Sequence, residues 1–223
     1  MVDLYPLFLD LEGRACLVVG AGTVAARKVE GLLAAGARVT VVAPEGVEPL
    51  GRLAAAGAVV WVGRRFEPSD LDGMALAFVA TSDPEVNREA VRQARARGVW
   101  VNAADDPGAS DVHVPAVLRR GRVAVAVSTA GASPALAAWL RDRLADAIPP
   151  GLEALAEVLA ALREITPPGA RLSGHAQREL LDSGILEDLA AAEWEEADRK
   201  VTRFLGADLR IGELLRRRST EAT

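Results

Sequence analysis

The strongest constraint on the fold is a glycine turn, Gly20-Ala21-Gly22, which lies between a short apolar run and a helical pattern. The apolar run, residues 15–19, is too short for a buried helix and has the length of a parallel strand. A helical pattern follows from Thr23 to Ala35, and a second β-rich run covers residues 38–42. Strand, glycine turn, helix and strand in about thirty residues are typical of a βαβ dinucleotide-binding unit.

Each glycine of this turn has a physical role. Gly20 permits the tight turn after the strand, and Gly22 lets the backbone approach a pyrophosphate without a Cβ in the way. The start of the next helix offers free N–H groups and a positive dipole end to that anion. Ala25 takes the place of the third glycine and still permits close packing of helix on strand. A turn that binds nothing is the alternative, but the complete βαβ context favours dinucleotide binding.

The end of the second strand lacks the acidic residue that usually holds the adenine ribose, because Ala43-Pro44 stands there. Glu45 follows and either takes that role or is a solvated loop residue. No arginine comes directly after the strand to receive a 2′-phosphate. The sequence therefore favours NAD over NADP as the cofactor.

Composition narrows the class of protein. A chain of 223 residues is long enough for one large core and a smaller second unit. The net charge of −5 argues against a nucleic-acid partner. The single cysteine, Cys16, cannot form an intrachain disulfide and agrees with a reducing compartment. No signal peptide and no apolar run of membrane-spanning length is found, so a cytoplasmic protein without membrane contact is expected.

Strands continue to alternate with helices to about residue 101, which predicts a doubly wound parallel sheet of the Rossmann type. A short strand or arm is expected at residues 7–9. The remaining predicted elements are a weak helix at 47–56, strands at 58–62 and 75–80, a helix from Pro84 to Arg97 and a strand from Val99.

Ligands of such sheets bind outside the carboxyl ends of the strands. This rule brings four segments to one cleft: residues 20–23, 43–45, 81–83 and 102–106. Asn102 lies in the last of these segments. For Thr81-Ser82-Asp83, contact with the cofactor and a role as the N-cap of the next helix are both consistent with the position after a strand.

The alternation stops after Asp106. Runs at 112–118 and 123–127 predict an antiparallel hairpin, and Ser133 and Pro134 are suited to the start of a helix that ends near Ile148. The rest is predicted to be helical, with a break at 167–169. We therefore expect a Rossmann domain at 1–111, a dimerisation region at 112–149 that forms a homodimer, and a helical domain at 150–223.

Five motifs in order resemble one known family. They are Pro6-Leu7-Phe8-Leu9, the run from Gly20 to Lys28, Ala80-Thr81-Ser82-Asp83-Pro84 with Asn87, the run from Val101 to Asp106, and the run from Ser128 to Ala137. The series is similar to precorrin-2 dehydrogenase, the dehydrogenase module of siroheme synthases, over about Leu4 to Pro150.

The resemblance implies an NAD-dependent oxidoreductase that converts precorrin-2 to sirohydrochlorin, in siroheme or a related tetrapyrrole pathway such as cobalamin or heme. Some members of the family also insert ferrous iron. The proposed catalytic aspartate of the family falls on Asp105, and its cofactor contacts fall on Thr23, Val24, Pro44 and Glu45. One departure is Ala130, which replaces a usual glycine and is expected to stiffen its turn.

The residues agree with this chemistry. Dehydrogenation needs a base near the nicotinamide, and Asp105 ends the fifth strand beside the cleft. The alternative is that Asp105 and Asp106 only begin a turn before Pro107-Gly108.

Precorrin-2 is a polycarboxylate, so its contacts should be cations and hydrogen-bond donors. The expected contacts, together with Asn102, are Arg119, Arg120, Ser128, Thr129 and Ser133. His113, expected in a strand, and His175 are the only histidines, and no metal site is predicted. The open alternatives are a dehydrogenase that is also a ferrochelatase, a ferrochelatase without dehydrogenase activity, and a non-enzymatic NAD-sensing module.

Overall fold

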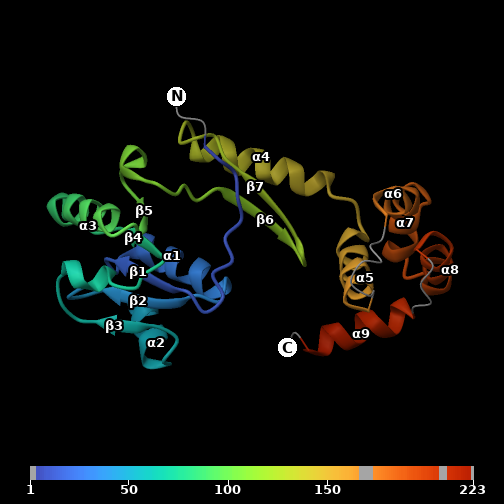
Figure 1. Cartoon of the computed structure of the whole chain (residues 1–223), viewed down its shortest axis with the longest axis horizontal. Coiled ribbons are helices and arrows are strands. Elements are labelled where there is room, and N and C mark those ends of the chain that lie inside the picture. The colour runs from blue at the N-terminus through green and yellow to red at the C-terminus, as the bar shows by residue number, and fades with distance from the viewer. Residues whose placement is uncertain (1–3, 166–172, 206–209, 222–223) are drawn as a thin grey trace. The chain divides into compact units, whose positions relative to one another are not determined.

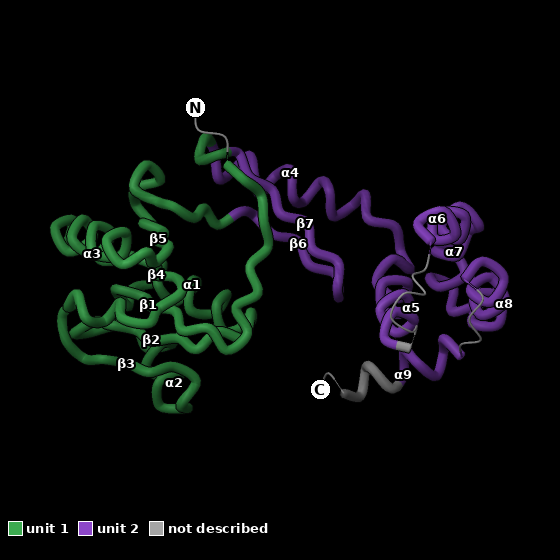
Figure 2. Tube along the Cα trace, viewed as in Figure 1, with its two compact units in different colours: residues 1–114, 130–132 green, residues 115–129, 133–223 purple. Residues whose placement is uncertain are grey.

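The computed structural model describes residues 4–165, 173–205 and 210–221. It divides into two compact units (Figure 2): residues 1–114 with 130–132 form unit 1, and residues 115–129 with 133–223 form unit 2. The predicted break at 167–169 lies outside the described residues.

Unit 1 is a parallel sheet of five strands in the order β3-β2-β1-β4-β5 (Figure 1). The order reverses beside β1, as in a doubly wound fold, and this confirms the predicted fold class. Its strands are β1 (Ala15–Val19), β2 (Arg38–Val42), β3 (Val60–Val62), β4 (Leu76–Val79) and β5 (Trp100–Ala103). Its helices are α1 (Thr23–Ala34), α2 (Glu48–Ala55) and α3 (Pro84–Ala96), with single 3₁₀ turns η1 (Pro68–Leu71) and η2 (Pro107–Ala109).

The strands of unit 1 are apolar on both faces because both faces are covered. Cys16 and Val18 of β1 pack with Val29 of α1, whereas Leu17 and Val19 pack in the cluster that contains the apolar face of α3. Successive strand residues point to opposite faces, so one unbroken apolar run supplies both cores.

Unit 2 contains an antiparallel hairpin and six helices within its described residues. The hairpin strands are β6 (Ala116–Arg120) and β7 (Val123–Val127), joined through Gly121, whose φ is 53°. The helices are α4 (Pro134–Ala147), α5 (Leu152–Ile165), α6 (Gly174–Asp182), α7 (Ile185–Ala190), α8 (Trp194–Leu205) and α9 (Ile211–Glu221). Buried leucine, isoleucine and valine side chains of α5 to α9 form one core. Along the described parts of the chain, no helix combines the length and apolarity needed to cross a membrane.

Two segments predicted as strands are not strands in the structure. Residues 7–9 pair with no strand among the described residues, which leaves the alternative of an arm, and Phe8 is 68% exposed. Residues 112–115 lie outside β6, and His113 is therefore not in a strand. Val112 bonds to β5 instead: its N–H donates to Val101 O at 3.2 Å and its carbonyl accepts from Asn102 Nδ2 at 2.8 Å. The main-chain groups of Val112 therefore bond to β5 and do not extend the hairpin.

Candidate active site

The carboxyl edge of the sheet collects the four segments expected there. The chain after β1 bonds to β2 through Gly20 N–H and Val42 O, 2.9 Å apart. The chain after β4 bonds back to β1 through Ala80 N–H and Val19 O, also 2.9 Å apart. β5 continues the same edge, because it pairs in parallel with β4. The predicted cofactor and catalytic segments of unit 1 therefore lie at one edge.

The two glycines of the first turn differ in what they require. Gly20 has φ of 107°, and a Cβ built there would lie 2.5 Å from Ala80 O, so no other residue fits without displacement of the backbone. Gly22 has φ of −83°, which any residue adopts, and a Cβ built there would meet nothing within 4 Å. The space over Gly22 is open, as close approach of a ligand to the backbone requires.

The start of α1 is suited to an anion. No side chain in the described part of the chain caps this helix, and its first turn holds no acidic residue. Thr23 and Val24 are exposed in that first turn. Uncapped N–H groups, the positive end of the helix dipole and the open backbone at Gly22 together fit the pyrophosphate of a dinucleotide.

The loop after β2 is fixed against this turn. Val47 N–H donates to Ala21 O at 2.9 Å, and Trp61 Nε1 donates to Ala43 O at 2.9 Å. Pro44 and Glu45 are exposed between these anchors. Both residues therefore border the open space at the end of β2, where a Rossmann unit holds the adenosine.

The loop after β4 is closed by its own side chains. Asp83 caps α3, because its Oδ1 accepts from the N–H groups of Glu85 at 3.0 Å and Val86 at 3.4 Å. The N-cap interpretation is thus confirmed for Asp83. The Thr81 hydroxyl donates to Asn87 Oδ1 at 2.6 Å and accepts from Asp83 N–H at 3.1 Å.

The neighbouring carboxylates after β5 have different environments. Asp106 Oδ1 accepts from Ala109 N–H at 3.2 Å and caps η2, as the turn interpretation expects. Asp105 makes no such cap: its Oδ2 accepts from Asn87 Nδ2 at 3.1 Å. Asp106 is a turn residue, whereas Asp105 is an exposed carboxylate held from the side by a buried amide.

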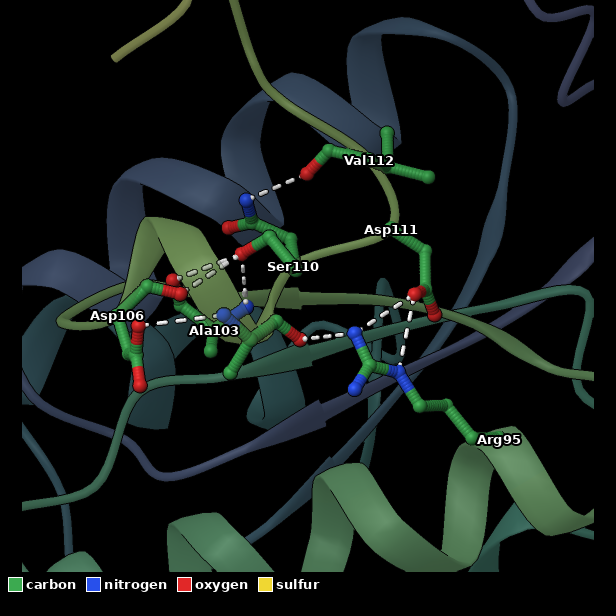
Figure 3. A network of polar contacts seen from close by, with 8 residues as sticks. Arg95, Ala103, Asp106, Ser110, Asp111 and Val112 are labelled. Carbon is green, nitrogen blue, oxygen red and sulfur yellow. Dashed lines mark hydrogen bonds and ion pairs between the residues drawn. The ribbon is translucent and has the colours of Figure 1, made fainter. Parts of the chain in front are cut away.

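The segment that follows Asp106 is folded back onto β5 (Figure 3). Ser110 Oγ accepts from Ala103 N–H at 2.9 Å, and Arg95 of α3 bonds to Asp111 at 2.9 Å. Asn102 is 8% exposed and its Oδ1 has no hydrogen-bond partner among the described residues. The predicted substrate contact Asn102 therefore donates to Val112 and keeps an unused acceptor.

The arginines at the hairpin have different surroundings. Arg119 and Arg120 are exposed and consecutive in β6, so their side chains point to opposite faces of the hairpin. Arg122 forms an ion pair with Glu157 of α5 at 2.9 Å. Arg119 and Arg120 remain the candidates for a carboxylate ligand.

The hydroxyl residues before α4 are partly engaged in local structure. Ser133 caps the helix, as predicted, because its Oγ accepts from Leu136 N–H at 3.1 Å. Thr129 Oγ1 accepts from Ser133 N–H at 3.1 Å, and Ser128 is exposed. Ala130 has φ of 51°, a left-handed conformation that a glycine adopts more readily.

Burial shifts the pKa of two groups in unit 1. It raises the pKa of the Cys16 thiol, which keeps this thiol protonated and unreactive. It lowers the pKa of Lys28, with a smaller contribution from the nearby charge of Arg27. The Lys28 ammonium lies 5.5 Å from the centre of the Phe78 ring. Among the described residues, no three histidine, cysteine, aspartate or glutamate side chains cluster as a metal site.

Comparison with known proteins adds to this geometry. A family model described as putative NAD(P)-binding matches residues 7–116, and one described as sirohaem biosynthesis protein central matches residues 120–147. The solved structure of SirC, a precorrin-2 dehydrogenase, matches 92% of this chain and 100% of its own, with a TM-score of 0.70 and 27% identity. The chain belongs to the precorrin-2 dehydrogenase family.

Curated relatives of this family are longer. A siroheme synthase of Chromobacterium violaceum is 44% identical over 163 residues, which are 73% of this chain and 35% of that protein. A siroheme synthase of Methylobacillus flagellatus is 39% identical over 202 residues, which are 89% of this chain and 43% of that protein. The chain therefore spans less than half the length of these relatives. The predicted family and the NAD-type cofactor are confirmed.

Asn87 is the site residue that the sequence analysis did not assign. It lies on the buried face of α3 with Ala90, Val91 and Ala94, and it is 5% exposed. A polar residue at the first position of an otherwise apolar helical face was the signal available in the sequence.

Proposed function

We propose that this chain is an NAD-dependent dehydrogenase that oxidises precorrin-2 to sirohydrochlorin. The observation that carries the proposal is the difference between the two carboxylates after β5. Asp106 is used in a cap, whereas Asp105 is exposed at the carboxyl edge and oriented by Asn87. The family and the uncapped start of α1 at the same edge support the cofactor.

The proposed reaction divides two hydrogens of the substrate between the cofactor and the protein. A nicotinamide cofactor held at the carboxyl edge would supply the hydride acceptor for this oxidation. Asp105 accepts the accompanying proton at its carboxylate and releases it to solvent. Gly22, Thr23 and Val24 would hold the pyrophosphate, and Pro44 and Glu45 would border the adenosine. Thr81 would flank the cofactor at the end of β4.

The test of the base is Asp105→Asn, which keeps shape but removes the basic carboxylate. Precorrin-2 and NAD should still bind, while the rate of dehydrogenation falls by about 10²–10⁴. The measurement is the ultraviolet–visible spectrum of precorrin-2 incubated with the protein, with and without NAD. Asp106→Asn is the matched control and should lower the rate by less than about tenfold. Equal, small losses in both variants would remove Asp105 as the base.

Ferrous iron added to the same assay separates the alternatives. Formation of siroheme from sirohydrochlorin would show a ferrochelatase as well as a dehydrogenase. Iron insertion by a chain that does not bind NAD would show a ferrochelatase alone. NAD binding with no change in the spectrum of precorrin-2 would favour a sensing module.

We propose further that the chain is a homodimer in the cytoplasm. α4 exposes an apolar face: Leu136, Trp139 and Leu140 are 51%, 56% and 40% exposed, and spacings of three and four residues place them on one side of the helix. A second copy of this face would cover it about a two-fold axis. We expect Leu140→Glu to give a monomer by light scattering; a wild-type monomer at micromolar concentration would contradict the proposal.

The preference for NAD over NADP stays a prediction. So do the contacts with the substrate, which are assigned to Arg119, Arg120, Ser128, Thr129, Ser133 and Asn102.

A further inference from the structure

Asn87 uses every polar atom of its side chain at the edge of the site. Its Oδ1 accepts from the Thr81 hydroxyl at 2.6 Å and lies 3.3 Å from Thr81 N, which also donates to it. Its Nδ2 donates to Thr81 O at 3.1 Å and to Asp105 Oδ2 at 3.1 Å. One amide thus ties the loop after β4 to the carboxylate after β5.

These contacts fix the amide orientation. The Thr81 main chain presents one donor and one acceptor, and only one orientation of the Asn87 amide satisfies both. Asn87 is 5% exposed, so a flipped amide would leave buried polar groups unsatisfied. The N–H that points to Asp105 is therefore held in place by the protein and needs no reorganisation when the substrate binds.

The carboxylate of Asp105 is anchored at one oxygen. Oδ2 accepts from Asn87, whereas Oδ1 has no hydrogen-bond partner within the described residues. A donor on Oδ2 restricts rotation of the carboxylate. Oδ1 is then available to take a proton. Asn87 itself is buried and is therefore not placed to contact the substrate directly.

We infer that Asn87 is a positioning residue of the dehydrogenase: it acts through Asp105, whose carboxylate it orients. This inference rests on the proposed function of Asp105. Without the Asn87 side chain Thr81 would still be held, because its hydroxyl also bonds to the main chain of Asp83. Loss of Asn87 should therefore affect the chemical step more than cofactor binding.

The first experiment is Asn87→Ala in the intact chain. We expect kcat for precorrin-2 oxidation to fall by about tenfold, with KM for NAD and for precorrin-2 within about threefold of the wild type. The matched control is Gln93→Ala on the same helix, since Gln93 bonds to Glu89 and Arg97 and not to Asp105. The control should keep kcat within about twofold. A wild-type kcat in Asn87→Ala would overturn the inference.

A double-mutant cycle separates positioning from general damage to the fold. If Asn87 acts through Asp105, adding Asn87→Ala to Asp105→Asn should lower kcat by less than about twofold further. The same tenfold loss in both backgrounds would overturn the inference. If Asp105→Asn alone has the wild-type kcat, the proposed function fails instead, and the two failures are thereby distinguished.

A second variant covers the case in which Asn87→Ala does not fold. Asn87→Asp has the same shape but turns the donor toward Asp105 into an acceptor. We expect a larger loss of kcat than in Asn87→Ala. The exchange Asn87→Asp with Asp105→Asn restores the donor–acceptor pair between the two side chains but leaves Thr81 O without the donor it has in the wild type. Thermal stability should therefore rise above that of Asn87→Asp alone, while kcat stays at the level of Asp105→Asn. A wild-type kcat in Asn87→Asp would contradict the inference, as would a return of kcat in the exchange.

Discussion

The helices α1 and α3 both begin at the carboxyl edge of the same sheet, yet their first turns are built differently. α1 begins at Gly22 without a side-chain cap or an acidic residue in its first turn, within the described residues. α3 begins at Asp83, whose carboxylate accepts two N–H groups, and Glu85 follows in the first turn. The N–H groups at the start of α1 are available to an anion, whereas those at the start of α3 already bond to a carboxylate. Of these two helices, α1 is therefore the one suited to hold a phosphate.

The largest expected effect comes from giving α1 the cap of α3. Gly22→Asp places a carboxylate where Asp83 stands on α3, so the free N–H groups gain an internal acceptor and the site gains a negative charge. We expect the dissociation constant for NAD to rise at least about 100-fold, or about 2.7 kcal/mol, while thermal stability is kept or raised. Calorimetric titration with NAD checks the first part and thermal unfolding the second. Unchanged NAD affinity would contradict the proposal that the uncapped start of α1 binds the pyrophosphate.

Gly22→Val tests size without charge. A Cβ at Gly22 meets no other atom within 4 Å, so the fold should be kept. The side chain occupies the space over the backbone, and we expect the NAD dissociation constant to rise at least about tenfold, or about 1.4 kcal/mol. A smaller loss than in Gly22→Asp would show that charge adds to bulk; wild-type affinity would mean that the dinucleotide does not approach this glycine.

The smallest effect on the cofactor is expected at α3. Asp83→Ala removes the cap, leaves two N–H groups without their acceptor and should cost about 1 kcal/mol of the free energy of unfolding. NAD affinity should stay within about threefold of the wild type, because this helix start is not used by the anion. Denaturant unfolding and NAD titration measure the two quantities. A large loss of NAD affinity would place the cofactor nearer α3 than proposed.

The parallel sheet and its helices could be predicted from the sequence because they depend on local patterns. Residues 15–19 and 38–42 are strands in the structure with the predicted bounds. The helix that follows Gly22 ends one residue earlier than predicted, at Ala34. The spacing of apolar residues and the positions of glycines are local features of the sequence, so these elements can be predicted without knowing which distant residues come into contact. The convergence of the segments at the carboxyl edge follows from parallel strand order alone.

The structure decided what depends on partners far along the chain. In the sequence Asp105 and Asp106 are adjacent and equivalent, and only the fold gives Asp106 a cap and brings Asp105 to Asn87, 18 residues away. Val112 was expected in the hairpin, but the open main-chain groups of β5 and the side chain of Asn102 bond to it instead. A side chain's partner is set by which backbone groups the packed fold leaves unsatisfied, and that is a property of the whole unit rather than of a local run of residues.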